Sequence, residues 1–136
     1  MAHIQHFNQR FISAAELGLS AVTLAAERTS NTINCEGMSQ LSLQIEYTYS
    51  AATRVDVNIE TSLDPAGSLT WALEHTEAIA AGAVTLSPED YQKAVSASVN
   101  LTIHKPINAR HVRVKISSTG GGASDLATVK ACLATN

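Results

Sequence analysis

From residue 17 onward, hydrophobic and polar residues alternate along the chain with a period of two. Each such segment has one apolar face and one polar face, which is typical of half-buried antiparallel strands. The clearest alternating segments are residues 41–49, 55–60, 69–73, 99–104, 112–116 and 129–133. Weaker strands are expected at residues 19–26, 32–36 and 83–86.

Turn-forming segments rich in Gly, Pro, Asp, Ser or small residues separate the alternating ones, at residues 51–53, 64–67, 81–82, 87–90 and 120–122. Eight or nine strands without helices between them predict an all-β, two-sheet antiparallel sandwich that is jelly-roll-like. A short N-terminal arm or helix precedes it. An α/β fold is disfavoured because parallel strands need crossover helices. One helical turn is expected at residues 87–93, with Ser87 as its cap and Pro88 at its first position.

The phase of the alternation also predicts the core and one hairpin. Side chains expected to be buried between the sheets are Ile45, Val57, Trp71, Leu101, Val114 and Val129. Within the hairpin at residues 62–71, we expect Asp64 to cap the turn and Trp71 to fill the core. The glycine run at residues 120–122 is expected to form a flexible hairpin between the strands at residues 112–117 and 125–133, since it lacks the Lys-Ser/Thr and the helix of a phosphate-binding loop.

The first sixteen residues follow a different pattern, with apolar side chains spaced as on one face of a helix: Ile4, Phe7, Phe11 and Ala14. Phe7 and Phe11 are the only two phenylalanines in the chain. A helix this short is marginal in water unless it docks on a surface. We therefore divide the chain into an arm, residues 1–16, and a single sandwich domain, residues 17–136. Ile4, Phe7 and Phe11 are expected to anchor the arm on a neighbouring subunit, or else to cap the chain's own core.

Composition limits the partners. Charged residues make up 15% of the 136 residues, against about 25% in typical domains, and the net charge is −3. Such a surface suits packing against other protein, because interface cores are depleted in charge. The overall charge argues against nucleic acid as a partner, and the longest apolar run, residues 78–84, is far too short to span a membrane. The N-terminus lacks the features of a secretory signal, so we expect the chain to be made and kept in a cytoplasm, or assembled there.

No motif for catalysis or for a cofactor is present. His3 and His6 are spaced for one helical face, yet two histidines without a third ligand make a poor zinc site. The remaining histidines, His75, His104 and His111, are expected to be solvated. No nucleophile motif accompanies any serine or cysteine, so we expect neither an enzyme nor a cofactor. Cys35 and Cys132 are expected to be free thiols, mostly buried.

One local cluster of basic residues lies on the strand expected at residues 112–116. His111, Arg113 and Lys115 share one face of that strand, while the intervening residues point inward. This face is a candidate contact for an acidic partner surface or an anionic glycan. The alternative is a solvated face whose charges pair with cross-strand acids such as Glu46 or Asp56.

The segment from about residue 39 to residue 133 resembles small structural proteins of tailed bacteriophage virions. The resemblance rests on the strand at residues 41–49, on a Ser62-Leu63-Asp64 … Thr70-Trp71 hairpin, and on the run Ala109-Arg-His-Val-Arg-Val followed by a glycine-rich turn. Galactose-binding-like sandwiches share sequence features of this kind. The resemblance implies a virion component, assembled in the host cytoplasm, with the major capsid protein or neighbouring virion subunits as partners.

The sequence therefore favours a non-enzymatic capsid decoration or cement protein that stabilises the phage head through symmetric contacts. The low charge predicts a homo-oligomer, and a trimer is expected by analogy with decoration proteins. The alternative is a carbohydrate-binding or adhesion module of the tail or neck. That alternative requires an exposed aromatic platform, for which Tyr47, Tyr49 and Tyr91 are the candidates.

Overall fold

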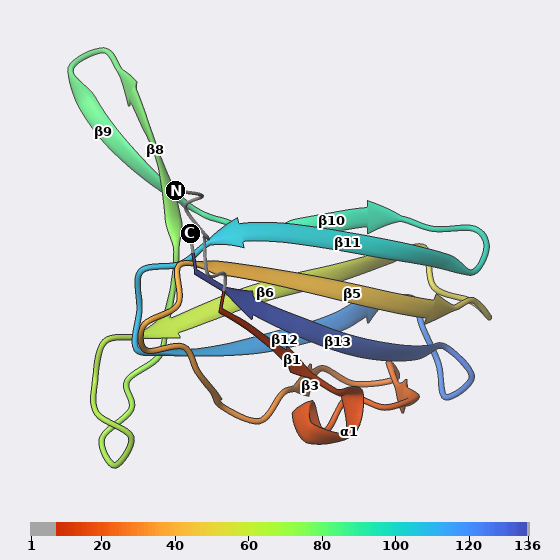
Figure 1. Cartoon of the computed structure of the whole chain (residues 1–136). Coiled ribbons are helices and arrows are strands. Elements are labelled where there is room, and N and C mark those ends of the chain that lie inside the picture. Colours follow the sequence, from red (N-terminus) through yellow and green to blue (C-terminus); the bar gives the residue numbers. More distant parts are fainter. Residues whose placement is uncertain (1–7, 136) are drawn as a thin grey trace, which may run out of the picture.

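The computed structural model describes residues 8–135, and it consists almost entirely of β-strands. Two antiparallel sheets pack face to face with the hydrophobic core between them (Figure 1). Consecutive long strands alternate between the sheets, as in a jelly roll. The predicted two-sheet antiparallel sandwich is confirmed. No helix in residues 8–135 has the length and apolar character needed to cross a membrane.

The first sheet has five strands and contains both the earliest and the last strand of the described chain. Along it, β1 pairs with β13, β13 with β5, and β5 with β11, while β2 pairs with one end of β13. The strands are β1 (Gln9–Ile12), β2 (Val22–Thr23), β5 (Gln40–Thr48), β11 (Val99–Pro106) and β13 (Leu126–Ala134).

The second sheet has six strands in the order β10, β6, β12, β3, with β7 beside β6 and β4 beside β12. Residues 87–88 end one strand and residues 91–93 begin another, with residues 89–90 connecting them, so the helical turn expected at residues 87–93 is wrong. The strands are β3 (Arg28–Thr29), β4 (Ile33–Asn34), β6 (Arg54–Ser62), β7 (Ala72–Leu73), β10 (Tyr91–Ala94) and β12 (His111–Thr119).

A third, two-stranded unit projects from the sandwich as a hairpin of β8 (His75–Ala80) and β9 (Ala83–Pro88) (Figure 1). Ala81 and Gly82 make its two-residue turn with φ of 51° and 76°. Two successive residues with positive φ match the twist of a tight hairpin. The turn expected at residues 81–82 is confirmed, although the full length of this hairpin was not expected.

Most of the side chains that the alternation predicts to be buried are in the core. Ile45, Val57, Val114 and Val129 are buried, whereas Leu101 is half-buried and packs at the core's margin. Trp71 is the exception. Its ring is half-buried on the outer face of the second sheet, with the guanidinium carbon of Arg113 4.7 Å from the ring centroid. The expectation that Trp71 fills the core is wrong, because it forms a cation–π contact outside the core.

The N-terminal part of the described chain departs from the expected helix. Residues 9–12 form β1, hydrogen-bonded along β13, so the helical period is wrong at Phe11. A single helical turn, α1 (Ala14–Leu17), follows it, with Ser13 and Glu16 completing a capping box and Gly18 closing its end. Ile12, Ala14 and Leu17 are buried. The arm boundary at residue 16 stays a prediction.

Candidate functional site

The expected anchoring residues fall in two groups. Ile4 and Phe7 lie outside the described residues. Phe11 lies on β1, where alternation turns Ile12 into the core and leaves Phe11 73% exposed. An exposed phenylalanine on an edge strand points away from the sandwich. Its position fits a contact with another molecule, which stays a prediction.

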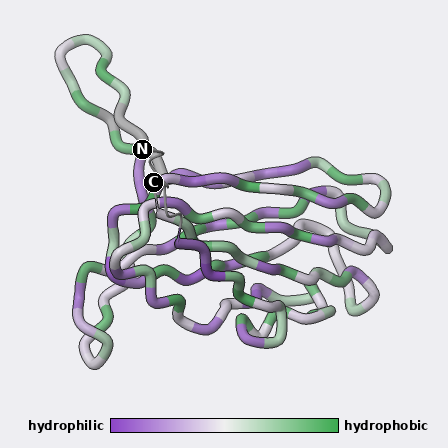
Figure 2. The backbone as a smooth tube through the Cα atoms, in the orientation of Figure 1, coloured by the Kyte–Doolittle hydropathy of each residue, from purple (hydrophilic) through white to green (hydrophobic). Residues whose placement is uncertain are grey.

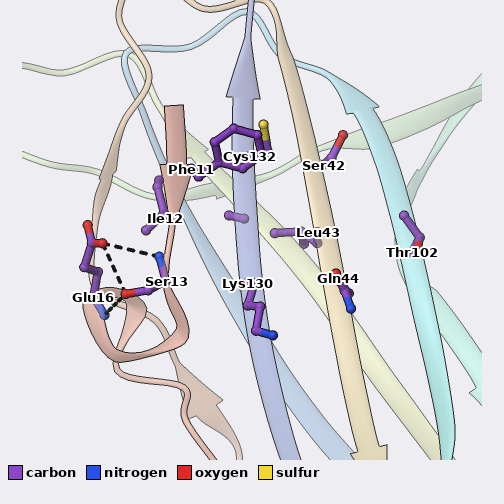
Figure 3. Close-up of a pocket in the computed structure, with 11 residues that line it drawn as sticks. Phe11, Ile12, Ser13, Glu16, Ser42, Leu43, Gln44, Thr102, Lys130 and Cys132 are labelled. Carbon is purple, nitrogen blue, oxygen red and sulfur yellow. Dashed lines mark hydrogen bonds between the residues drawn. The ribbon is translucent and has the colours of Figure 1, made fainter. Parts of the chain in front are cut away.

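Phe11 forms one wall of a shallow groove across β1, β13, β5 and β11 (Figure 3). The groove has a volume of about 440 Å³. Ile12, Leu43, Ala131 and Cys132 belong to its lining. Glu16 and Lys130 are its charged members, on α1 and β13. Ile12, Leu43 and Ala131 are buried and face the core, so the outer face of the first sheet presents mainly polar side chains to the groove beside Phe11: Ser42, Gln44, Thr102 and Lys130.

A second exposed apolar surface lies on the β8–β9 hairpin. Ile79 is 76% exposed, Val84 60% and Leu86 59%. Ile79 lies directly opposite Val84 in the hairpin register, so the two side chains share one face, and Leu86 lies two residues further on that face. Figure 2 colours much of this projection as hydrophobic. The sequence signal was present, because residues 78–84 form the longest apolar run.

A buried lysine ties the base of this hairpin to the sandwich. The Lys105 side chain on β11 is 5% exposed, and its Nζ lies 2.6 Å from Glu74 Oε2 and 2.9 Å from Glu89 Oε2. Glu74 immediately precedes β8 and Glu89 immediately follows β9. The Tyr91 hydroxyl donates to the second oxygen of Glu89 at 2.8 Å. Burial by itself would lower the pKa of Lys105, but the two carboxylates raise it above its usual value. Sequence reasoning missed this cluster.

The basic face is neutralised within the chain. Arg113 Nε lies 2.9 Å from Glu60 Oε1, and Lys115 Nζ lies 3.3 Å from the same oxygen. Burial alone would raise the pKa of Glu60, yet the two cations lower it. His111 is buried, with Nδ1 3.2 Å from the Asp64 carbonyl oxygen, so its expected solvation is wrong. The acidic partners of Arg113 and Lys115 are Glu60 and Glu27 rather than the expected Glu46 or Asp56. Binding by this face stays a prediction.

The remaining histidines and the cysteines have no shared site. His75 and His104 are exposed, and His104 Nδ1 is 2.8 Å from the Ser42 hydroxyl. Within residues 8–135, no group of three or more His, Cys, Asp or Glu side chains is placed to hold a metal ion. Cys35 and Cys132 are both free, as expected. Burial raises the pKa of the Cys35 thiol to about 11, which leaves it protonated at neutral pH.

Asp125, at the end of the glycine-rich turn, is a fully buried carboxylate that sequence reasoning missed. Its Oδ1 accepts hydrogen bonds from the Tyr47 hydroxyl and from the amides of Ser50 and Ala52, and Ala51 contacts both oxygens. Its Oδ2 accepts from the Gly122 amide at 2.8 Å. Burial would raise the pKa of Asp125, but these donors hold it well below its usual range. The hairpin expected around residues 120–122 is wrong, because β12 belongs to the second sheet and β13 to the first, and the two do not pair. The chain crosses between the sheets here, and Asp125 fastens this connection to the loop after β5.

Tyr47 is therefore excluded as an aromatic surface on which a glycan could stack. Tyr47 is 2% exposed, and its hydroxyl donates to Asp125, so its ring is not a surface for stacking. Burial, followed by the hydrogen bond to Asp125, raises the pKa of Tyr47. Tyr91 is half-buried with its hydroxyl engaged by Glu89. Tyr49 is 38% exposed and is the remaining candidate of the three.

No family model and no curated protein matches the chain. Similar solved structures exist. The crystal structure of SPBc2 prophage-derived protein YomS has a TM-score of 0.53 at 13% identity, with 99% of this chain and 100% of that chain covered. The infectious bursal disease virus VP2 subviral particle has a TM-score of 0.53 at 12% identity, with 96% of this chain and 33% of that chain covered.

A second structure from that virus, the Gx strain, has a TM-score of 0.50 at 13% identity, with 97% of this chain and 33% of that chain covered. This chain thus spans the full length of the prophage protein and about a third of each infectious bursal disease virus chain. At these identities the similarity establishes the shared fold. The sandwich of this chain is therefore one also found in a prophage-derived protein and in viral particle proteins.

Proposed function

We propose that this chain is a non-enzymatic structural protein of a virion, and that it serves as a decoration or cement protein on a phage head. The observation that supports this most is the group of exposed apolar side chains on the β8–β9 hairpin, Ile79, Val84 and Leu86, with Phe11 exposed at a separate place. Large exposed apolar side chains gathered in one place mark interaction sites. The fold shared with a prophage protein and with VP2 supports the same assignment.

The proposed contacts are with the major capsid protein or with neighbouring copies, and a trimer is the proposed oligomer. Repetition around symmetry axes lets modest interfaces add up, because each bound contact raises the effective concentration for the next. Ile4, Phe7 and Phe11 are proposed as the anchor in these contacts. Removing residues 1–7 should then leave the melting temperature unchanged and weaken assembly. A lower melting temperature with unchanged assembly would instead assign those residues to the chain's own fold.

The cement role is tested on phage heads produced with and without this chain. We expect heads that lack the chain to lose their packaged DNA at a lower temperature, measured by dye access during heating. Adding the purified chain should restore the wild-type transition at a fixed ratio of chain to capsid protein. Heads that neither bind the chain nor change their transition would refute the proposal.

The adhesion alternative has one structural observation in its favour, the partial exposure of Tyr49. A saturable signal on a glycan array that Tyr49→Ala abolishes would support it. Equal binding by the wild type and Tyr49→Ala, or no binding, would leave that alternative without a site.

A further inference from the structure

The edges of the two sheets are built in two different ways. Three of the four edges consist of strands of two to four residues: β1 with β2, β3 with β4, and β7 with β10. Each of these edges also carries a basic side chain, Arg10 on β1, Arg28 on β3 or Lys93 on β10. Short edge strands and charged side chains both discourage a sheet edge from pairing with another chain. These three edges are therefore protected.

The fourth edge, β11, lacks both features along most of its length. It is an unbroken strand of eight residues, and all eight pair with β5 (Figure 1). Among the described residues, no other strand pairs with β11. Its exposed side chains before Pro106 are Asn100, Thr102 and His104, and none of them is Lys, Arg, Asp or Glu. The free side of β11 is therefore a row of backbone donors and acceptors without charged side chains beside it.

A charged group lies at the C-terminal end of this strand. Lys105 faces inward, and an inward-facing charge discourages pairing at a sheet edge. Its Nζ lies 2.6 Å from Glu74 Oε2 and 2.9 Å from Glu89 Oε2, so both acids also lie at this end of β11. The part of the edge that is open to another strand is therefore residues 99–104.

The inward-facing side chains of this open part are apolar and incompletely covered. Leu101 and Ile103 pack against the core, yet both are half-buried. Together with Tyr91 of β10, they line a cleft of about 350 Å³ between the two edge strands. A strand added to β11 places its own inward-facing side chains beside Leu101 and Ile103. The best occupant is thus a strand whose inner side chains are apolar and whose outer ones are uncharged, and β11 itself has this pattern.

We propose that β11 of one copy pairs antiparallel with β11 of a second copy, with the two Thr102 residues directly opposite each other. A two-fold axis at Thr102 sets Asn100 of each copy opposite His104 of the other on the outer face. It sets Leu101 opposite Ile103 on the inner face. Thr–Thr and apolar pairs at directly opposed positions stabilise strand pairing, and no like charges meet. The first sheets of the two copies then join into one continuous sheet.

The contact is small, and it is distinct from the proposed trimer. Five residues from each copy are far fewer than the roughly 20–30 that each side of a stable interface provides, so an isolated pair dissociates readily. A two-fold axis relates two copies, so on a shell this contact joins copies of neighbouring trimers, where other contacts raise the effective concentration. The inference goes beyond the proposed function, because the pairing is a property of the chain alone in solution.

Disulfide trapping tests the register. Cys132→Ser removes the half-buried thiol and leaves the buried Cys35. In that background, Thr102→Cys should form a disulfide-linked dimer on mild oxidation, seen by non-reducing electrophoresis. Directly opposed Cα atoms in an antiparallel pair are about 4.5–5.5 Å apart, which a disulfide spans. Thr48→Cys in the same background is the matched control, because Thr48 is exposed on the neighbouring strand β5, and it should stay monomeric.

Charge substitution tests the same contact without a covalent bond. Thr102→Lys alone and Thr102→Glu alone should each dimerise at least about tenfold more weakly than the wild type, because like charges then oppose each other. An equimolar mixture of the two should dimerise again, since opposite charges meet. Thr48→Lys should dimerise like the wild type. Sedimentation velocity over a concentration series measures these differences, and circular dichroism confirms that each variant is folded.

Three results would overturn the pairing of β11 with β11. They are a Thr102→Cys chain that cross-links no faster than Thr48→Cys, a Thr102→Lys chain that dimerises as strongly as the wild type, and a wild-type chain that stays monomeric throughout the series. Binding of the wild-type chain to phage heads is scored separately. A chain that binds heads and gives any of these three results refutes the β11 contact and leaves the proposed function standing.

Discussion

At the scale of single residues, the buried carboxylate of Asp125 accepts hydrogen bonds from five donor groups. Its carboxylate is 0% exposed, and hydrogen bonds from the Tyr47 hydroxyl and from four backbone amides compensate its charge. Charge-assisted bonds of this kind are roughly twice as strong as neutral ones. The loop after β5 and the turn before β13 are therefore joined through one side chain.

Asp125→Ala should lower the free energy of unfolding by at least about 3 kcal/mol, because it leaves several buried donors without an acceptor. Urea denaturation followed by tryptophan fluorescence measures the loss. Asp64→Ala is the comparison, since Asp64 accepts one backbone bond, from Thr70 at 2.9 Å, and should cost about 1 kcal/mol. Equal losses for both variants would contradict the central role of Asp125.

The same carboxylate predicts how stability depends on pH. Its pKa is lower in the folded chain than in the unfolded chain, where it is about 3.9. Its contribution is thus complete above about pH 5 and falls as the pH drops through the unfolded pKa toward the folded pKa. The difference in unfolding free energy between the wild type and Asp125→Asn should shrink between pH 5 and pH 2. A constant difference over that range would show that the charge of Asp125 is not what the donors stabilise.

Residue-scale errors in the sequence analysis have a common cause. Trp71 and His111 were placed by alternation, which gives the face of a strand and not what covers that face, and the burial of Lys105 was not expected. Arg113 stacks over Trp71, and the Asp64 carbonyl approaches His111. Lys105 is buried by acids that lie 31 and 16 positions away, at Glu74 and Glu89. Such contacts depend on tertiary structure, which spacing along one strand does not contain.

At the scale of elements, β1 shows where a short apolar pattern misleads. Phe11 and Ala14 are three residues apart, as on a helix, yet a strand ends at Ile12 and a helical turn begins at Ala14. The capping box at Ser13 marks this boundary and was readable in the sequence as Ser13 followed by Glu16. Pairing with β13 favours the strand, because an extended segment beside an open sheet edge satisfies its backbone groups.

Because the Phe11 side chain faces outward and the Ile12 side chain faces the core, substitutions at these two positions on β1 should change the unfolding free energy by different amounts. Phe11→Ser should change the unfolding free energy by less than about 0.5 kcal/mol, since the ring is 73% exposed. Ile12→Ala should cost about 2–4 kcal/mol, because Ile12 is 5% exposed in the core. Chemical denaturation of the two variants checks this. Similar losses at both positions would mean that the Phe11 ring packs within its own chain.

At the scale of the whole molecule, the fold class was predictable because period-two alternation repeats over six segments and gives the buried face correctly in five of them, residues 69–73 being the exception. Strands such as β5, β6, β12 and β13 lie within a residue or a few of their expected positions. The projection of β8–β9 was not predictable. Residues 78–84 indicated apolar character, but only the three-dimensional arrangement separates a buried strand from an exposed hairpin.

The central proposal is that the exposed apolar surfaces of this sandwich serve its assembly into a virion. The most direct measurement is quantitative mass spectrometry of purified phage particles from the host that carries this gene. We expect the chain in a fixed ratio to the major capsid protein, unchanged by high-salt washing, since the proposed contacts are apolar. A chain that is abundant in the cell lysate and absent from washed particles would contradict the claim.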